Sequence, residues 1–253
     1  MVSLETERLA SFLRSAGATL HPDLELFGRR AHDKSERGAF AAAPIAKGET
    51  LLKLPRSAVL TACEGGSECD WMPTGAREAS PILRVALFML REEAQGEHSA
   101  WAPYLRTLPT AYDTLEHWEQ SELAALKGTS VYDELAGLRD SAGDLVGPAR
   151  VMWEKSVRPV VAAAPEHWPD SSLASFLRAC AAVRTRGFYD SADGGGGPYM
   201  LPAIDMLNHA REGTSTSLSV ERGDGVLVFS MEAERDIEVG EEITHTCVVE
   251  DEG

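Results

Sequence analysis

The chain has 253 residues, of which 43% are hydrophobic, and a formal net charge of −16, so soluble folding around a packed core is expected. Residues 221–253 alone hold eleven acidic residues against Arg222 and Arg235. Such a surface repels nucleic-acid phosphates and excludes a nucleic-acid partner, whereas a Lys-rich protein segment suits it. A solvated acidic face without a partner is the alternative interpretation.

The cysteines and the apolar runs bear on redox state and location. No C-x-x-C pair occurs, so neither a zinc ribbon nor a thioredoxin-type site is indicated, and reduced thiols favour the cytoplasm or the nucleus. The run near residues 82–90 is too short and too closely flanked by charges to span a bilayer. We expect an intracellular monomer without membrane contact, with an organelle as the alternative location. The cysteines are Cys63, Cys69, Cys180 and Cys247.

The first predicted element is an amphipathic helix within residues 1–20, with Leu9, Phe12 and Leu13 at helical spacing. Short apolar stretches in residues 21–62, cut by glycines and Pro55, predict three or four strands joined by tight turns.

From Ser80 onward the apolar period becomes helical. Pro81 directly after Ser80 fits the first helical position behind an N-cap. Further helices are predicted at about residues 115–126, 132–153 and 172–183.

The last part of the chain returns to extended structure. A hairpin is predicted around Gly223, Asp224 and Gly225. Two β-rich ends around a helical middle most simply form one sheet system with a helical insertion, which predicts an α+β fold.

Two short motifs suggest a site. PAIDMLNHA places Asp205, Asn208 and His209 within five positions, which fits a metal site, an acid/base pair or a hydrogen-bonding cradle for a cofactor. A metal-dependent hydrolase would need further ligands at suitable spacing, and the sequence supplies none, so no metal is predicted. In SERGAF, Gly38 allows main-chain groups to approach a ligand closely, although a plain hairpin turn gives the same pattern.

Five segments in a fixed order carry a resemblance to a known family. They are SERGAFAAAPIAKGE, SAWAPYLRTLP at residues 99–109, VRTRGF at 183–188, PAIDMLNHA and RDIEVGEEIT at 235–244. The chain thus resembles SET-domain protein methyltransferases, in the branch of the Rubisco large-subunit lysine methyltransferase and its animal relatives that act on lysine or histidine.

This resemblance implies a domain organisation and a cofactor. It implies a SET-domain β fold with a pseudoknot in residues 21–62 and 181–253, interrupted by a mainly helical inserted subdomain at residues 63–180. The cofactor is expected to be S-adenosylmethionine, and the partner a protein with a lysine or a histidine acceptor. The C-terminal part is expected to be truncated, without the helical substrate-docking domain of related enzymes.

The resemblance also implies roles for individual residues. Arg186 is expected to lie between the cofactor carboxylate and the substrate, and Asp190 and Asp205 on the substrate side. The expected cofactor-binding residues are Ser35, Glu36, Arg37, Gly38, Arg186, Asn208 and His209.

One position departs from the family pattern. In GEEITHTC, Cys247 stands where the family has its catalytic tyrosine, and a thiol is shorter and a weaker hydrogen-bond partner than a phenol. The expected function is methyl transfer to a protein lysine. The alternative is a catalytically impaired module that binds the cofactor or a protein partner.

Overall fold

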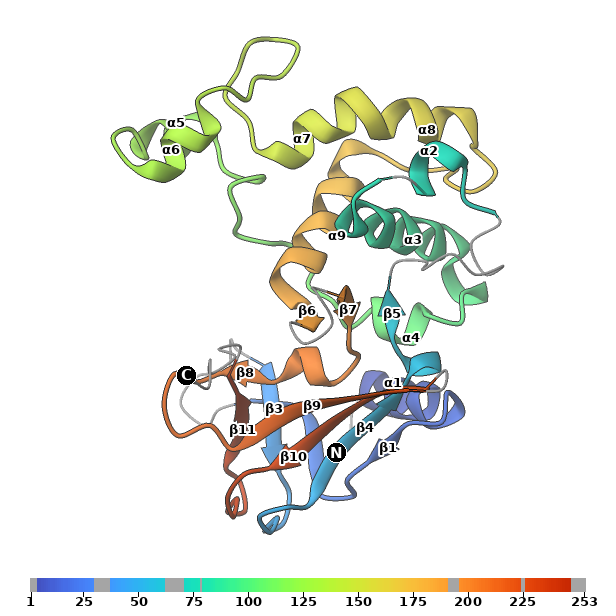
Figure 1. Cartoon of the computed structure of the whole chain (residues 1–253), viewed down its shortest axis with the longest axis vertical. Coiled ribbons are helices and arrows are strands. Elements are labelled where there is room, and N and C mark those ends of the chain that lie inside the picture. Colours follow the sequence, from blue (N-terminus) through green and yellow to red (C-terminus); the bar gives the residue numbers. More distant parts are fainter. Residues whose placement is uncertain are drawn as a thin grey trace. The chain divides into compact units, whose positions relative to one another are not determined.

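The computed structural model describes residues 4–29, 37–61, 71–77, 79–190, 196–223 and 226–246. The chain divides into two compact units. The first combines Met1–Leu60, Asp190–Gly195 and Tyr199–Gly253, and the second combines Thr61–Tyr189 with Gly196–Pro198. Figure 1 shows the first unit as mainly strands and the second as mainly helices, as the predicted α+β fold requires.

The first unit is built around one sheet, whose strands follow the order β1-β4-β10-β9-β11-β3-β2, with β8 paired to β11. Strands from both ends of the chain therefore interleave, which makes the sheet a single structure. Its elements are α1 (Leu4–Ser15), β1 (Thr19–Leu20), β2 (Leu24–Arg29), β3 (Arg37–Ala41), β4 (Thr50–Pro55), η1 (Arg56–Ala58), η6 (Ile204–Met206), β8 (Asn208–His209), β9 (Thr216–Gly223), β10 (Val226–Ala233) and β11 (Glu242–His245).

The pairing of β4 with β10 forms the centre of this unit. Phe229 lies opposite Leu54 and Met231 opposite Leu52, and all four side chains are fully buried. β9 and β10 are antiparallel with Val226 opposite Gly223, which confirms the predicted hairpin.

Helix α1 adds to the apolar packing of the first unit. Leu9 and Leu13 lie one turn apart on one face and are completely buried. Acidic residues in its first turn and Arg14 in its last turn match the helix dipole, and the predicted N-terminal helix is confirmed.

The second unit is mainly helical, and its strand residues belong to a three-stranded sheet of order β5-β7-β6. Its long helices are α3 and α9, and Ser80 caps α3 with Pro81 at the first helical position, as predicted. The elements are β5 (Leu60–Thr61), α2 (Thr74–Arg77), α3 (Pro81–Gln95), η3 (Gly96–His98), α4 (Ala102–Leu105), α5 (Gln120–Ala125), α6 (Ser130–Leu135), α7 (Pro148–Met152), η4 (Trp153–Val157), α8 (Arg158–Ala163), α9 (Leu173–Arg186), β6 (Gly187–Asp190) and β7 (Gly196–Met200).

Buried polar contacts fix the helices of this unit. Arg178 on α9 makes two bonds of 2.9 and 2.6 Å to the Glu93 carboxylate on α3. The buried Glu92 carboxylate accepts a 2.7 Å bond from Ser99 Oγ, which itself accepts from Trp101 N. The first residues of SAWAPYLRTLP are thus anchored on α3.

The predicted continuous helix at residues 132–153 is wrong. Helix α6 ends at Leu135, and α7 begins at Pro148. Between them Asp140 Oδ1 accepts 3.0 Å bonds from Ala142 N and Asp144 N, and this local bonding competes with a helix.

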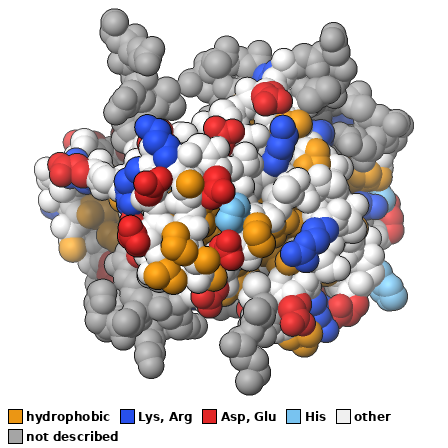
Figure 2. Space-filling model, turned by 90° about the horizontal axis from the view of Figure 1, so that it is seen from below, with side chains coloured by type: hydrophobic (Ala, Val, Ile, Leu, Met, Phe, Trp, Pro, Cys, Tyr) orange, Lys and Arg blue, Asp and Glu red, His pale blue; other side chains and the backbone are white. Residues whose placement is uncertain are grey.

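Within the described ranges, none of the helices combines the length and apolar composition needed to cross a membrane. In the view of Figure 2, acidic and basic side chains are interspersed among the described residues, with hydrophobic ones between them.

Candidate functional site

Two segments far apart in the sequence meet at Gly38 on β3. A Cβ atom at Gly38 would lie 3.0 Å from Asn208 Nδ2 and 2.8 Å from Glu242 Oε1, which is closer than side chains pack. A Cβ atom at this position would force the Glu242 carboxylate to move and would crowd the Asn208 amide, so glycine fits best beside this strand. The predicted cofactor-contact segments around Gly38 and Asn208 therefore lie next to each other, within the first unit.

The side-chain amide of Asn208 joins two strands. Its Nδ2 donates to the Arg37 carbonyl oxygen at 3.2 Å and to Glu242 Oε1 at 2.7 Å. The second bond is charge-assisted because its acceptor is a carboxylate. The Nδ2 group is thus engaged within the protein, and the main chain of this segment and the amide oxygen are what it can offer to a ligand.

The segment after Asn208 is held against β11. β8 and β11 are parallel, with Asn208 opposite Thr244 and His209 opposite His245, and Ala210 N donates to His245 O at 3.1 Å. His209 is exposed, whereas His245 is buried. Burial lowers the pKa of His245 from its ordinary value, the nearby His209 charge lowers it further, and the bond to the Thr246 carbonyl opposes both.

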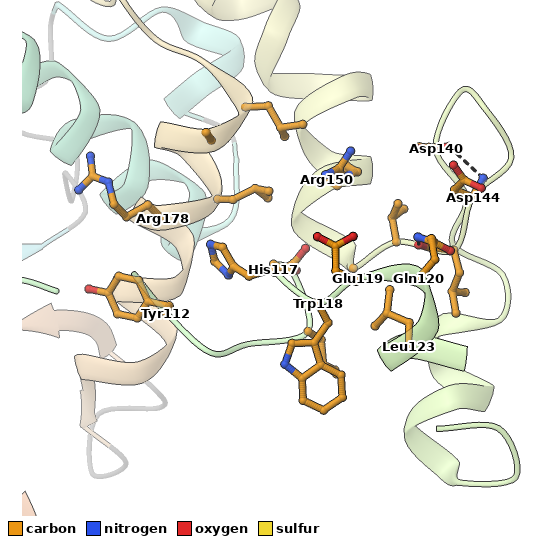
Figure 3. A pocket seen from close by; sticks show the side chains of 18 of the residues that line it. Tyr112, His117, Trp118, Glu119, Gln120, Leu123, Asp140, Asp144, Arg150 and Arg178 are labelled. Atoms are coloured by element: carbon orange, nitrogen blue, oxygen red, sulfur yellow. Dashed lines mark hydrogen bonds between the residues drawn. The ribbon is translucent and has the colours of Figure 1, made fainter. Parts of the chain in front are cut away.

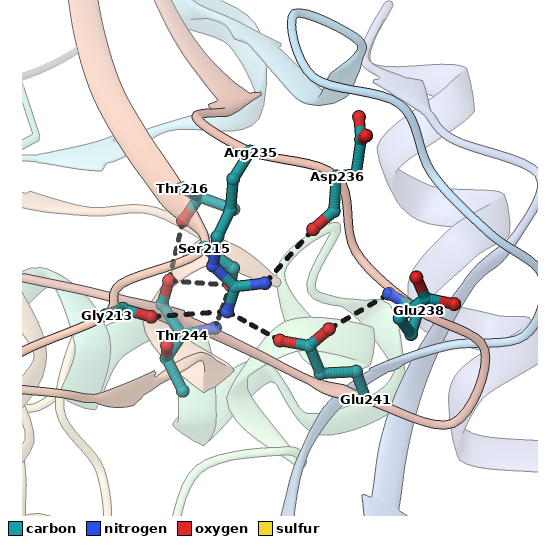
Figure 4. A network of polar contacts seen from close by, with 8 residues as sticks. All are labelled: Gly213, Ser215, Thr216, Arg235, Asp236, Glu238, Glu241 and Thr244. Carbon is teal, nitrogen blue, oxygen red and sulfur yellow. Dashed lines mark hydrogen bonds and ion pairs between the residues drawn. The ribbon is translucent and has the colours of Figure 1, made fainter.

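A second group of contacts holds the loop that follows. Figure 4 shows Arg235 among these residues, with Nη2 donating to Gly213 O at 3.2 Å and to Glu241 Oε1 at 2.5 Å. Ser215 accepts a 2.8 Å bond from Thr244 N. The Arg235 hydrogen bond lowers the pKa of Glu241 from its ordinary value.

Arg37 and Asp205, two further predicted site residues, lie in the same unit. The Arg37 guanidinium is 4.0 Å from Glu5 on α1 and 5.4 Å from the centre of the Phe27 ring. The side chain of Arg37 is thus directed to α1, whereas its main-chain carbonyl accepts the hydrogen bond from Asn208. Asp205 lies buried on the short 3-10 helix η6, and its predicted role on the substrate side stays a prediction.

The remaining predicted residues are not brought together with Gly38 and Asn208 by any described contact. Arg186 is the last residue of α9 and belongs to the second unit. Asp190 ends β6, and its side chain lies outside the described set. Ser35, Glu36 and Cys247 also lie outside the described residues, so their roles stay predictions.

Three residues at this junction were not predicted. Glu242 binds Asn208, Arg235 binds the following loop, and His245 lies opposite His209. The repeated acid of GEEIT was the available signal for Glu242, but a carboxylate at a partly exposed position is also satisfied by water, so the motif alone does not predict its partner.

A separate cleft of about 890 Å3 lies in the second unit. Figure 3 shows Arg178 and Tyr112 at one end, Asp140 and Asp144 at the other, and Arg150 between them. No site was predicted there. In the described part of the chain, no group of three or more His, Cys, Asp or Glu side chains is placed to hold a metal ion.

Comparisons with known proteins identify a family for the chain. The family model described as "SET domain" matches residues 36–247. The chain is 24% identical over 224 residues to the fructose-bisphosphate aldolase-lysine N-methyltransferase of Arabidopsis thaliana, and 26% identical over 218 residues to the Rubisco large subunit N-methyltransferase of Nicotiana tabacum. Each alignment covers 81% of this chain. The actin-histidine N-methyltransferase of Drosophila melanogaster is 32% identical over 93 residues, which are 37% of this chain and 17% of that protein.

Solved structures show the same fold. The SET domain of LSMT bound to lysine and AdoHcy matches with a TM-score of 0.71 and 18% identity, over 97% of this chain and 54% of that one. Rubisco LSMT bound to AdoMet matches with a TM-score of 0.69 and 20% identity, over 98% and 54%. The chain spans 42% and 41% of the length of the first two relatives.

Proposed function

Since the chain belongs to the SET domain family, we propose that it is an S-adenosylmethionine-dependent methyltransferase that modifies a lysine side chain of a protein. The observation that carries this proposal is the junction of Arg37, Gly38 and Asn208. At this junction the 3.2 Å hydrogen bond from Asn208 Nδ2 to the Arg37 carbonyl joins the two chain segments that we expect to contact the cofactor.

The residues at this junction fit the cofactor. Gly38 is buried, and the absence of a Cβ atom there lets the Asn208 and Glu242 side chains lie directly against its main chain. We assign the main chain around Ser35, Glu36 and Arg37 and that of Asn208–His209 to cofactor binding. When bound, the cofactor supplies an electrophilic methyl group on a sulfonium sulfur.

The chain's own contribution is orientation and exclusion of water. Methyl transfer needs donor and acceptor in line, and fixed positioning supplies much of the rate enhancement in such reactions. A lysine amine has a reference pKa of about 10.4 and must lose its proton before it attacks. We assign Arg186 to the cofactor carboxylate, and Asp190 and Asp205 to the substrate side.

The choice of lysine is supported by what the relatives' names say. The relatives from Arabidopsis thaliana and Nicotiana tabacum are named for aldolase lysine and for the Rubisco large subunit, and the Drosophila melanogaster relative for actin histidine. The lysine-specific name belongs to a match that covers 81% of this chain, against 37% for the histidine-specific one.

A transfer assay tests the proposal. The purified chain is incubated with methyl-labelled S-adenosylmethionine and protein extracts, and the modified residue is identified by mass spectrometry. Labelled lysine supports the proposal. Labelled histidine would show that the acceptor is histidine instead of lysine. Calorimetric titration with S-adenosylhomocysteine is run in parallel, and absence of binding would overturn the function.

A cofactor-binding module without catalysis is the second candidate, and Cys247 at the family's tyrosine position favours it. A Cys247→Tyr variant separates the two. Transfer that appears only in Cys247→Tyr, with unchanged cofactor binding, supports the impaired module. Transfer by the unchanged chain rules it out.

A further inference from the structure

The two adjacent acids Glu241 and Glu242 hold different parts of the segment that follows η6. Successive side chains at a strand point to opposite sides. Glu242 accepts from Asn208 Nδ2 at 2.7 Å, at the start of the segment. Glu241 binds Arg235, which donates to Gly213 O farther along. The pair of acids therefore makes two independent attachments.

The attachment through Glu242 is held by several contacts at once. Asn208 Nδ2 bonds Glu242 and the Arg37 carbonyl at once, and the α-carbon of Gly38 closes the space beside them. Glu242 itself pairs with Phe40 of β3 through the backbone. Three strands, β3, β8 and β11, are thus tied at one amide group.

A carboxylate is the acceptor that sets the orientation of this amide. A carboxylate offers acceptors, so the contact with Glu242 favours the rotamer of Asn208 that presents Nδ2 rather than Oδ1. The Arg37 carbonyl imposes the same choice from the other side. The amide oxygen of Asn208 and the main chain leading to His209 are then held in one arrangement.

We propose that Glu242 is a positioning residue of the cofactor site, an inference that rests on the proposed function. It acts through Asn208, by fixing the distance between the main chain at Gly38 and the main chain at His209. Glu241 has no such role, because one of its side-chain contacts is with Arg235, which reaches Gly213, and the other is with Glu238 N in the turn before β11.

Calorimetric titration of S-adenosylhomocysteine into purified variants of the full chain tests this inference. Glu242→Ala should raise the Kd at least about tenfold, since the lost bond involves a charged acceptor. Glu242→Gln keeps one acceptor and should fall between that variant and the unchanged chain. Glu241→Gln is the matched control, and it should lower the melting temperature while its Kd stays within about twofold.

An exchange of donor and acceptor sharpens the test. Asn208→Asp places two carboxylates together and should weaken binding at least as much as Glu242→Ala. Adding Glu242→Gln to Asn208→Asp supplies a donor from the other side, so the double variant should regain part of the lost affinity. Because Asn208 and Glu242 are in direct contact, a merely structural role predicts recovery of the melting temperature in the double variant while the Kd of the folded protein stays unchanged in all three variants.

The outcomes separate the inference from the proposed function. If the unchanged chain binds and Glu242→Ala binds equally well, the positioning role is overturned and the function stands. Equal losses of affinity in Glu242→Gln and Glu241→Gln, without recovery in the double variant, also overturn it. If the unchanged chain does not bind, both fall together.

Discussion

The ring of His209 stands edge-on to the ring of His245, with their centroids 6.3 Å apart and their planes at 83°. The two residues are register partners in the parallel pair of β8 and β11. The ring of His209 is exposed, whereas the ring of His245 is buried.

Protonation of His245 should destabilise the fold at mildly acidic pH. Burial lowers its pKa in the folded state, so the unfolded chain binds the proton more readily. Its neutral form is fully favoured above the unfolded pKa of about 6.5. The free energy of unfolding should fall as the pH drops below that value toward the folded pKa. Urea unfolding at pH 7.5 and at pH 5.5 measures this change.

Replacement of His245 removes the titrating group and should flatten this dependence. His245→Leu is the test variant, and His117→Gln, at an exposed position in the second unit, is the control. A pH slope that survives in His245→Leu but disappears in His117→Gln would contradict the assignment.

The ion pair of Glu241 with Arg235 should respond to pH in a lower range. The guanidinium lowers the pKa of Glu241, so this stabilisation is complete above the unfolded value of about 4.3 and is lost as the pH falls through the folded one. Both side chains are partly exposed, which limits the contribution to under about 1 kcal/mol. Glu241→Gln should speed amide hydrogen exchange in residues 210–216 at pH 7, measured by mass spectrometry. Unchanged exchange there would show that Arg235 holds the loop without its partner.

A methyl group at Gly147 should disrupt a buried carboxylate. A Cβ there would lie 2.2 Å from Glu116 Oε2, and Glu116 also accepts from Ala149 N at 2.9 Å and from Arg184 at 3.3 Å. Gly147→Ala should therefore lower the free energy of unfolding by about 1–3 kcal/mol through overpacking. Chemical denaturation measures this loss.

Gly137 offers the matched control, because a Cβ there would meet no atom within 4 Å. Gly137→Ala should be neutral or slightly stabilising. An equal loss in both variants would mean that backbone freedom, rather than the collision with Glu116, sets the cost.

Cys180 should be inert in the folded protein. Burial raises the pKa of its thiol to about 12, with Arg184 opposing and Glu116 adding to the shift. At pH 8 roughly one thiol in ten thousand is ionised, and only the thiolate reacts. Iodoacetamide should leave Cys180 unmodified in the native protein and label it in urea, as peptide mass spectrometry can show. Native labelling at the unfolded rate would contradict its burial.

Local patterns were enough to predict several elements. Leu9 and Leu13 marked α1, Ser80 and Pro81 marked the start of α3, and glycines marked the hairpin of β9 and β10. Each signal lies within a few residues of the element that it specifies. The break between α6 and α7 was missed because Asp140 bonds its own loop, an alternative that helical periodicity does not reveal.

The candidate site was predictable in part. The resemblance selected Gly38 and Asn208, which the structure brings together. Glu242 was missed because its contact with Asn208 spans 34 positions and depends on strand register. The roles of Arg186 and Asp190 stay predictions, as do those of Ser35, Glu36 and Cys247.

The dependence of the junction on β11 has a kinetic consequence. Ile243 pairs with Ala39, a partner roughly two hundred residues earlier, and closing so long a loop is entropically costly before any contact rewards it. β3 and β8 each pair with β11, so the junction is complete only once β11 has joined both strands. Folding of this unit should thus be slow, and the cofactor junction should be among the last parts to form. A ligand present during refolding would then bind and stabilise the chain only after that final step.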